Sequence, residues 1–189
     1  MPQIKTRSDI SGSLFHLTRA RTGKNPKTGL QVLCEILGTK KIKGSGNLGY
    51  VKGKVEASCF TESPLSSLIE YLPTEDSKSR YECYGIAFSK KSGFKAGARP
   101  VIYLPDNESQ WIPEQEKWRL VQLSYDHGID WTHEREWRIK GDLDLSQLAG
   151  FYIIHHNPSE QKIIRRHLDE KLKKLVRGYL PMEHLAKIL

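Results

Sequence analysis

Six short segments rich in β-branched and aromatic residues constrain the fold more than any other feature of this chain. They lie at residues 13–18, 55–62, 81–90, 98–105, 131–142 and 151–156, and each reads as a strand. Helical spacing of apolar residues between them predicts helices over 30–38, 63–72 and 114–123. A long amphipathic helix is expected over 158–180, with Gly178 as its C-cap. Strands and helices that follow one another without an internal repeat indicate an α+β domain.

The length of 189 residues suits a single domain with its own core. We expect that domain to span residues 1–189, with a flexible start at 1–12 and a helical appendage at 157–189. No apolar run approaches the roughly 20 residues of a membrane span, and the first residues do not resemble a secretory signal. Three widely separated cysteines are typical of buried thiols in a reducing compartment. These features predict a cytoplasmic protein with no membrane partner.

The net charge of +8 is unevenly distributed along the chain. Residues 1–54 hold eleven Lys and Arg against Asp9 and Glu35, a net charge of +9, whereas residues 55–150 are net acidic. A basic segment of this kind can meet phosphates, because neutralising them releases counterions. An ordinary solvated surface is the alternative, since no recognition motif for nucleic acid accompanies the charge.

The stretch WTHEREWRIKGD, residues 131–142, places acidic and apolar side chains in alternation. In a strand, Glu134, Glu136 and Arg138 would share one face, and Trp137 and Ile139 would pack on the other. The acidic row suits cleavage of an N-glycosidic bond, since a carboxylate can face the positive charge that develops on the ribose. A glutamate paired with a nearby Lys or Arg on a sheet surface is the alternative.

A second polar row is expected near the start of the chain. In FHLT, His16 and Thr18 share one face of the strand, so an imidazole and a hydroxyl lie side by side. Together with the acidic row of residues 134–138, this pair forms the strongest candidate site in the sequence.

Three other motifs carry less weight. GSGNLGYV, residues 44–51, matches a phosphate-binding glycine pattern but does not lie between a strand and a helix, so a basic loop is the better interpretation. Cys59 with His16 could form a nucleophile and base, although nothing in the sequence brings them together. His155 and His156 point to opposite faces of a strand, and no metal site is expected.

LFHLTR near the start, CFTESPL in the middle and EREWRI late in the chain together resemble the ADP-ribosyltransferase superfamily. H-x-T on the first strand is similar to the DarT-type and tRNA phosphotransferase branches. The run from CFTESPL through YGIAFSKKSGFKAGARPVIYL to EREWRI resembles the putative abortive phage resistance AbiGi-like family. The resemblance covers roughly residues 14–140, and His16 stands where the Arg-first class has arginine.

This resemblance implies a split, mixed or antiparallel sheet with flanking helices and a C-terminal amphipathic helix. It implies that Glu136 is the catalytic carboxylate and that Glu134 assists it. It further implies that His16 and Thr18 hold NAD, which is consumed as a substrate. Three more candidates for the cofactor site, toward the nicotinamide, are Ser58, Thr61 and Tyr84, where SCFTES matches the family pattern only in part.

The activity implied by the resemblance is transfer of ADP-ribose from NAD to a nucleic acid or a protein acceptor. The resemblance also implies a role in phage defence, abortive infection or a toxin–antitoxin pair, with an antitoxin or defence partner. The alternative is a non-catalytic component of such a system that keeps the fold and binds a partner or nucleic acid. The two hypotheses differ in whether His16 and Glu136 converge on one cleft.

Overall fold

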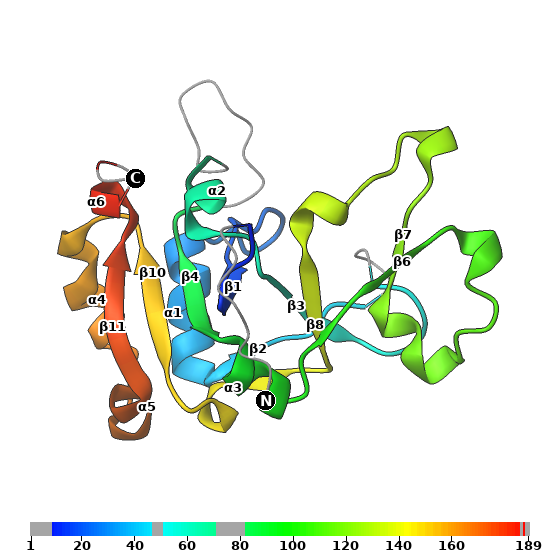
Figure 1. Ribbon diagram of the computed structural model, residues 1–189. Coiled ribbons are helices and arrows are strands. Elements are labelled where there is room, and N and C mark those ends of the chain that lie inside the picture. Colours follow the sequence, from blue (N-terminus) through cyan, green and yellow to red (C-terminus); the bar gives the residue numbers. More distant parts are fainter. Residues whose placement is uncertain (1–8, 47–50, 71–81, 186, 188–189) are drawn as a thin grey trace, which may run out of the picture.

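A sheet flanked by short helices forms the body of the molecule (Figure 1). The computed structural model describes residues 9–46, 51–70, 82–185 and 187. The fold is mixed α/β with a mostly antiparallel sheet, which agrees with the α+β class predicted from the order of segments. Within the described residues, no helix is both long enough and apolar enough to cross a membrane.

The main sheet has seven strands, of which the pair β10 and β11 is parallel and the other neighbours are antiparallel. In sheet order the strands are β11 (Val176–Pro181), β10 (Phe151–His155), β4 (Gly85–Ser89), β1 (Ser13–Leu17), β3 (Ala57–Thr61), β8 (Glu136–Lys140) and β5 (Arg99–Pro100). The two smaller sheets pair β2 (Lys41–Ile42) with β9 (Leu143–Asp144), and β6 (Ile102–Leu104) with β7 (Leu120–Gln122).

Helices bury apolar side chains on both faces of the main sheet. The α-helices are α1 (Gly29–Thr39), α2 (Leu65–Glu70), α3 (Lys90–Lys95), α4 (Gln161–Arg165), α5 (Glu170–Leu175) and α6 (Met182–Leu185). On one face, α1, α4 and α5 pack against Leu14, Phe60 and Ile86. On the other face, α2 and α6 pack around Phe15 and Ile154. Because strand residues alternate between faces, both rows of β1 are buried along part of its length.

Local sequence explains the limits of α1. Thr28 and Gln31 form a capping box, in which the hydroxyl accepts from the Gln31 N–H and the Gln31 side chain accepts from the Thr28 N–H. The helix continues past Gly38, where the sequence predicted its end, and stops at Lys40, whose φ of 60° is left-handed. The apolar stripe of α1 that packs on the core ends earlier, at Leu37.

The main sheet splits between β1 and β3. Within the described strands, β1 and β3 share a single paired position, Phe15 with Thr61, whereas β1 stays paired with β4 from Ser13 to Leu17. Gly85 helps to hold that second pair close, because a Cβ there would collide with the carbonyl oxygen of His16. The strands that carry the first and the late sequence motifs therefore lie on opposite sides of an opening.

A separate lobe stands beside the end of the main sheet at β8 and β5, at the right of Figure 1. It contains β6, β7 and the 3₁₀ turns between residues 106 and 127. The helix expected over 114–123 is not formed: Glu114–Arg119 is a 3₁₀ helix, and the chain then enters β7. Trp118, the buried residue of that turn, packs with Val51 and Ala57 and attaches the lobe to the sheet.

The long C-terminal helix and the helical appendage expected from the sequence are wrong. Residues 158–180 form a 3₁₀ turn, the two short helices α4 and α5, and the edge strand β11 of the main sheet. Gly178 lies in β11 and is not a helix cap. The segment is part of the domain core, since Ile164, Leu168 and Leu172 are buried against the sheet.

Candidate functional site

A cleft of about 1530 Å³ opens where the sheet splits, between the main sheet and the lobe. It receives side chains from β1, β3, β8, the lobe and the segment at residues 51–54. Of the seven site residues suggested by the sequence, four line it: His16, Thr61, Glu134 and Glu136. The first and late motifs thus converge on one cleft, which is the geometry that separated the enzyme hypothesis from its alternative.

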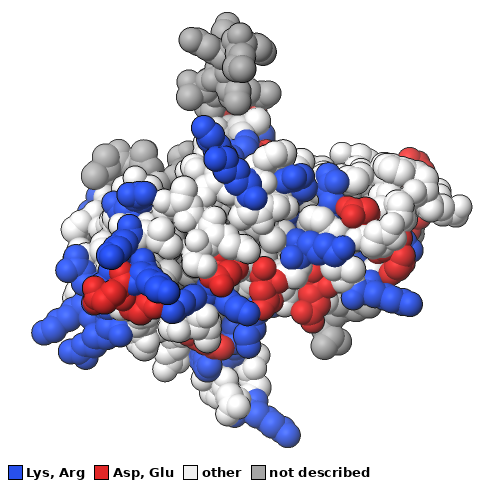
Figure 2. All heavy atoms as spheres, turned by 90° about the horizontal axis from the view of Figure 1, so that it is seen from below, with Lys and Arg blue, Asp and Glu red and all other residues white. Residues whose placement is uncertain are grey.

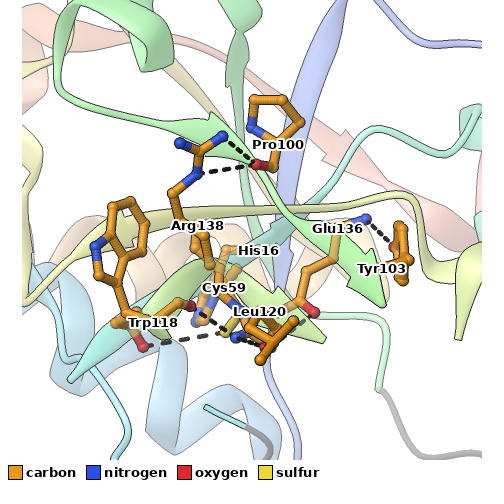
Figure 3. A network of polar contacts seen from close by, with 10 residues as sticks. His16, Cys59, Pro100, Tyr103, Trp118, Leu120, Glu136 and Arg138 are labelled. Atoms are coloured by element: carbon orange, nitrogen blue, oxygen red, sulfur yellow. Dashed lines mark hydrogen bonds and ion pairs between the residues drawn. The ribbon is translucent and has the colours of Figure 1, made fainter. Parts of the chain in front are cut away.

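Glu136 is the first residue of β8 and pairs with Thr61 of β3. Its contacts with Arg138 and Tyr103 can be followed in Figure 3. Its Oε1 accepts from Nε of Arg138 at 2.8 Å and its Oε2 accepts from Nη2 at 3.0 Å. Its backbone N–H donates to the hydroxyl of Tyr103 in β6, at 3.1 Å. The Glu136 side chain keeps 18% of its surface exposed. A fixed carboxylate is therefore accessible from the cleft.

Arg138 is completely buried, with 0% of its surface exposed. Burial alone lowers the pKa of a guanidinium, but hydrogen bonding and charge from Glu136 raise the pKa of Arg138 above its usual range. The Nη1 group donates to the carbonyls of Trp118 at 2.7 Å and Leu120 at 3.2 Å. The sequence alternative of a glutamate paired with a neighbouring Arg is therefore present, and the paired glutamate also lines the cleft.

Glu134 reaches the cleft from a turn and not from a strand. The strand expected over 131–142 begins only at Glu136, since Thr132–Glu134 is a 3₁₀ turn. Arg135 between them has a φ of 44°, a left-handed conformation that is uncommon for a residue with a side chain. The regular acidic row predicted by strand alternation is therefore wrong, although both carboxylates line the same cleft.

Hydroxyl groups from the end of β3 hold this turn in place. The hydroxyl of Thr61 donates to the carbonyl of Glu134 at 2.6 Å, and that of Ser63 donates to the carbonyl of His133 at 3.3 Å. The N–H of Glu62 donates to the carbonyl of Arg135 at 3.2 Å. These bonds fix a left-handed residue that local preference disfavours.

His16 crosses the opening between β1 and β3. Its Nδ1 lies 2.9 Å from the carbonyl oxygen of Cys59, and since a carbonyl only accepts, Nδ1 carries the proton. Burial lowers the pKa of His16, while the bond to Cys59 raises it in part. A neutral His16 with a proton on Nδ1 leaves Nε2 as an acceptor. The imidazole can therefore receive a hydrogen bond from a ligand hydroxyl.

Cys59 lines the cleft, but its thiol is a poor nucleophile. Burial raises the pKa of Cys59 strongly, and the nearby carboxylate of Glu136 raises it further. The imidazole of His16 contacts the backbone of Cys59 and not its sulfur. The nucleophile-and-base pair considered from the sequence is therefore disfavoured, because the thiol stays protonated.

Three residues assigned to NAD binding by the resemblance do not line the cleft. Thr18 is buried, and its hydroxyl donates to the carbonyl of Gly29 at 3.0 Å, at the start of α1. Ser58 is buried and donates to the carbonyl of Gly141 at 3.1 Å. Tyr84 donates to Oε1 of Glu160 at 2.7 Å, near α4. Each of these hydroxyl groups donates a hydrogen bond within the protein and lies away from the cleft lining, so we do not assign the three residues to the cleft.

Sequence reasoning missed Arg138 and Tyr103 as parts of the site. The sequence placed Arg138 on the same strand face as Glu136, two residues away. That spacing of opposite charges was the signal for an ion pair between them. No pattern linked Tyr103 to Glu136, because they meet only where the lobe joins β8. Five cations line the cleft: Arg19, Lys52, Lys54, Lys117 and Arg138.

No family model, no curated protein and no solved structure matches this chain. The chemistry of the cleft is therefore argued from its own residues.

Proposed function

We propose that the protein is an NAD-consuming ADP-ribosyltransferase whose active site is the cleft between the main sheet and the lobe. The observation that carries this proposal is that His16 of the first strand and Glu136 of the late strand line one cleft at the split of the sheet. The order of motifs that resembled the superfamily supports the same proposal.

Glu136 supplies the chemistry that glycosidic cleavage needs. When the bond between ribose C1 and the nicotinamide nitrogen breaks, nicotinamide leaves with the bonding electron pair, and positive charge develops on the ribose. A carboxylate held beside that carbon lowers the barrier by stabilising the charge. The acceptor nucleophile then forms the new bond to C1 and passes its proton to the carboxylate of Glu134, which lines the same cleft.

The remaining lining groups suit the other parts of NAD. His16 can accept from a ribose hydroxyl through Nε2, and Arg19, Lys52 and Lys54 can contact the pyrophosphate. The volume of about 1530 Å³ exceeds the roughly 300–1,000 Å³ of common ligand pockets, which leaves space for an acceptor beside NAD.

The proposed acceptor is a nucleic acid or a protein, and the proposed setting is a cytoplasmic phage-defence or toxin–antitoxin system with an antitoxin or defence partner. The resemblance of the sequence motifs supports this setting, whereas the residues of the cleft bear only on the reaction. Whether label from NAD enters protein or nucleic acid distinguishes the two acceptor classes.

The test is incubation of the purified protein with NAD labelled in the adenine ring, with and without cell lysate. We expect label to enter one macromolecular fraction, protein, DNA or RNA, and free nicotinamide to be released in step. The matched control is the Glu136→Gln variant, in which both nicotinamide release and label transfer should be slower by about 100-fold but still measurable. Absence of nicotinamide release by the parent protein under all these conditions would reject the proposal.

A second function is favoured by one observation, the two-point bond between Glu136 and Arg138. A carboxylate engaged in this way can serve folding alone, and the protein would then be a non-catalytic binder of a partner or nucleic acid. In that case NAD would not change the melting temperature of the parent protein. If the cleft binds NAD as a substrate, NAD in excess of its Kd should raise that melting temperature.

A further inference from the structure

Arg138 has an unusual position for a charged side chain. It lies at the centre of β8, is completely buried, and yet sits beside a large cleft. Burying a guanidinium costs several kcal/mol unless its donors are satisfied. Here the donors meet Oε1 and Oε2 of Glu136 and the carbonyls of Trp118 and Leu120.

We infer that Arg138 is a positioning residue, which holds the carboxylate of Glu136 in one orientation and fixes that carboxylate to the lobe wall of the cleft. This inference rests on the proposed function, because it names the residue through which the proposed catalytic group is oriented.

The geometry of the pair leaves Glu136 able to act. A carboxylate has about four acceptor positions, and the Nε and Nη2 groups of Arg138 occupy one on each oxygen. The fork of the guanidinium matches the plane of the carboxylate, so the pair restricts rotation of the carboxylate as well as its place. The exposed edge of Glu136 therefore keeps a fixed direction toward the cleft.

The second pair of bonds links this orientation to the lobe. Trp118 lies in the last turn of the 3₁₀ helix Glu114–Arg119 that precedes β7, and Leu120 begins β7 and lines the cleft. The same guanidinium thus contacts the proposed catalytic group on the sheet and the backbone of the facing wall. Tyr103 of β6 adds a further contact from the lobe to the Glu136 backbone. A small movement of the lobe would therefore move the carboxylate.

Arg119 offers a matched control within the same lobe. Its Nε and Nη2 donate to the carbonyl of Pro100, at 3.3 and 3.1 Å, so it also ties the lobe to the sheet. Unlike Arg138, it is not among the residues that line the cleft. A role limited to holding the lobe would make the two arginines equivalent.

The experiment compares Arg138→Lys with Arg119→Lys in steady-state release of nicotinamide from NAD. Lysine keeps the charge but cannot bind both carboxylate oxygens in the plane of a fork. We expect kcat of Arg138→Lys to fall by about 10- to 100-fold with KM for NAD within about threefold, because misplacement by about 1 Å is costly for catalysis. Arg119→Lys should keep kcat within about threefold. Equal losses in both variants, or an unchanged kcat in Arg138→Lys, would overturn the inference.

A double variant tests the same claim if Arg138→Lys does not fold. Replacing both partners, as Arg138→Met with Glu136→Gln, removes both charges and so avoids an unpaired buried ion. If Arg138 acts through Glu136, the residual nicotinamide release of this double variant should equal that of Glu136→Gln within about threefold. A further large loss would show an independent role and overturn the inference. Failure of the proposed function is separate, since it appears as no NAD cleavage by the parent.

Discussion

The carboxylate of Glu136 pairs with the buried Arg138 and also lines the open cleft. Its two oxygens accept from Arg138, and its side chain lines the cleft with 18% of its surface exposed. The proposed catalytic residue is therefore also a residue that stabilises the fold. Replacing this carboxylate should therefore affect the free energy of unfolding as well as activity.

We expect Glu136→Gln to slow NAD cleavage by about 100-fold and to lower the free energy of unfolding by about 1–3 kcal/mol. The stability loss arises because the amide leaves one Arg138 contact without a charged acceptor. Urea unfolding and nicotinamide release measure the two effects, and Glu170→Gln on the exposed end of α5 is the control. An unchanged free energy of unfolding would contradict a stabilising role for the pair of Glu136 and Arg138.

The identity of the site residues was predictable to different degrees. His16 and Glu136 could be chosen because they fall in ordered motifs, and both line the cleft. Thr18 shared a strand face with His16, but the start of α1 covers it, and no strand pattern contains that information. Cys59 could be chosen as a candidate nucleophile, but its reactivity could not be judged from the sequence. Its raised pKa depends on burial and on the nearby carboxylate of Glu136.

At the scale of elements, caps explain why a continuous helical pattern did not give a continuous helix. Ile164, Leu168 and Leu172 keep helical spacing and are all buried. Asp169, however, acts as an N-cap, since its side chain accepts from the Leu172 N–H at 2.8 Å. A strong start signal inside the pattern divides it, which the apolar spacing alone does not reveal.

Sheet pairing overrides local preference at both ends of the late motifs. Residues 176–181 join β10 as a parallel edge strand, although the preceding residues favour helix. The strand at 136–140 is shorter than its alternating pattern because Arg135 turns the chain. Ile139 is buried as the alternation predicted, and Trp137 is partly buried and packs against the same core. Alternation therefore predicted the faces of β8 but not its beginning.

At the scale of the whole molecule, the half-buried His16 and the buried His155 should make the fold sensitive to mild acid. Burial lowers the pKa of His16 and of His155 from the ordinary value of 6.5. His155 is buried, and its Nδ1 donates to the carbonyl of Asn157 at 2.8 Å. The unfolded chain then binds more protons than the folded chain below about pH 6.5, so the free energy of unfolding falls as the pH is lowered.

Urea unfolding at pH 7.5, 6.0 and 5.0 measures this effect. We expect the free energy of unfolding to be highest at pH 7.5 and to decrease toward pH 5.0. The double variant His16→Gln with His155→Gln should show a smaller decrease over the same range. His127→Gln, in an exposed turn, should retain the parent slope. A parent slope that persists in the double variant would assign the acid sensitivity to other groups.

In the described part of the chain, the cations of the basic N-terminal segment are divided between the cleft and other parts of the surface. Figure 2 shows cations and carboxylates alternating over the face that is seen from below. Among the described residues, Arg21 and Lys27 pair with Glu35, Lys40 pairs with Asp169, and Lys52 pairs with Asp106. The glycine-rich loop that separates the lysines lies partly outside the described residues, at 47–50. Lys52 and Lys54 line the cleft, whereas Lys41 lies in the β2–β9 pair.

This separation predicts two different responses to charge reversal. Lys52→Glu with Lys54→Glu should raise KM for NAD by about tenfold at low salt, because the change places negative charge beside the proposed pyrophosphate site. Lys41→Glu with Lys43→Glu changes the net charge equally but should leave KM within about twofold, since neither residue lines the cleft and salt screens exposed charges. Nicotinamide release at 50 and 300 mM salt measures both, and the difference between the pairs should narrow at the higher concentration. Equal effects from the two pairs would mean that net charge alone attracts NAD, and the lysines of the cleft would then have no special role in binding it.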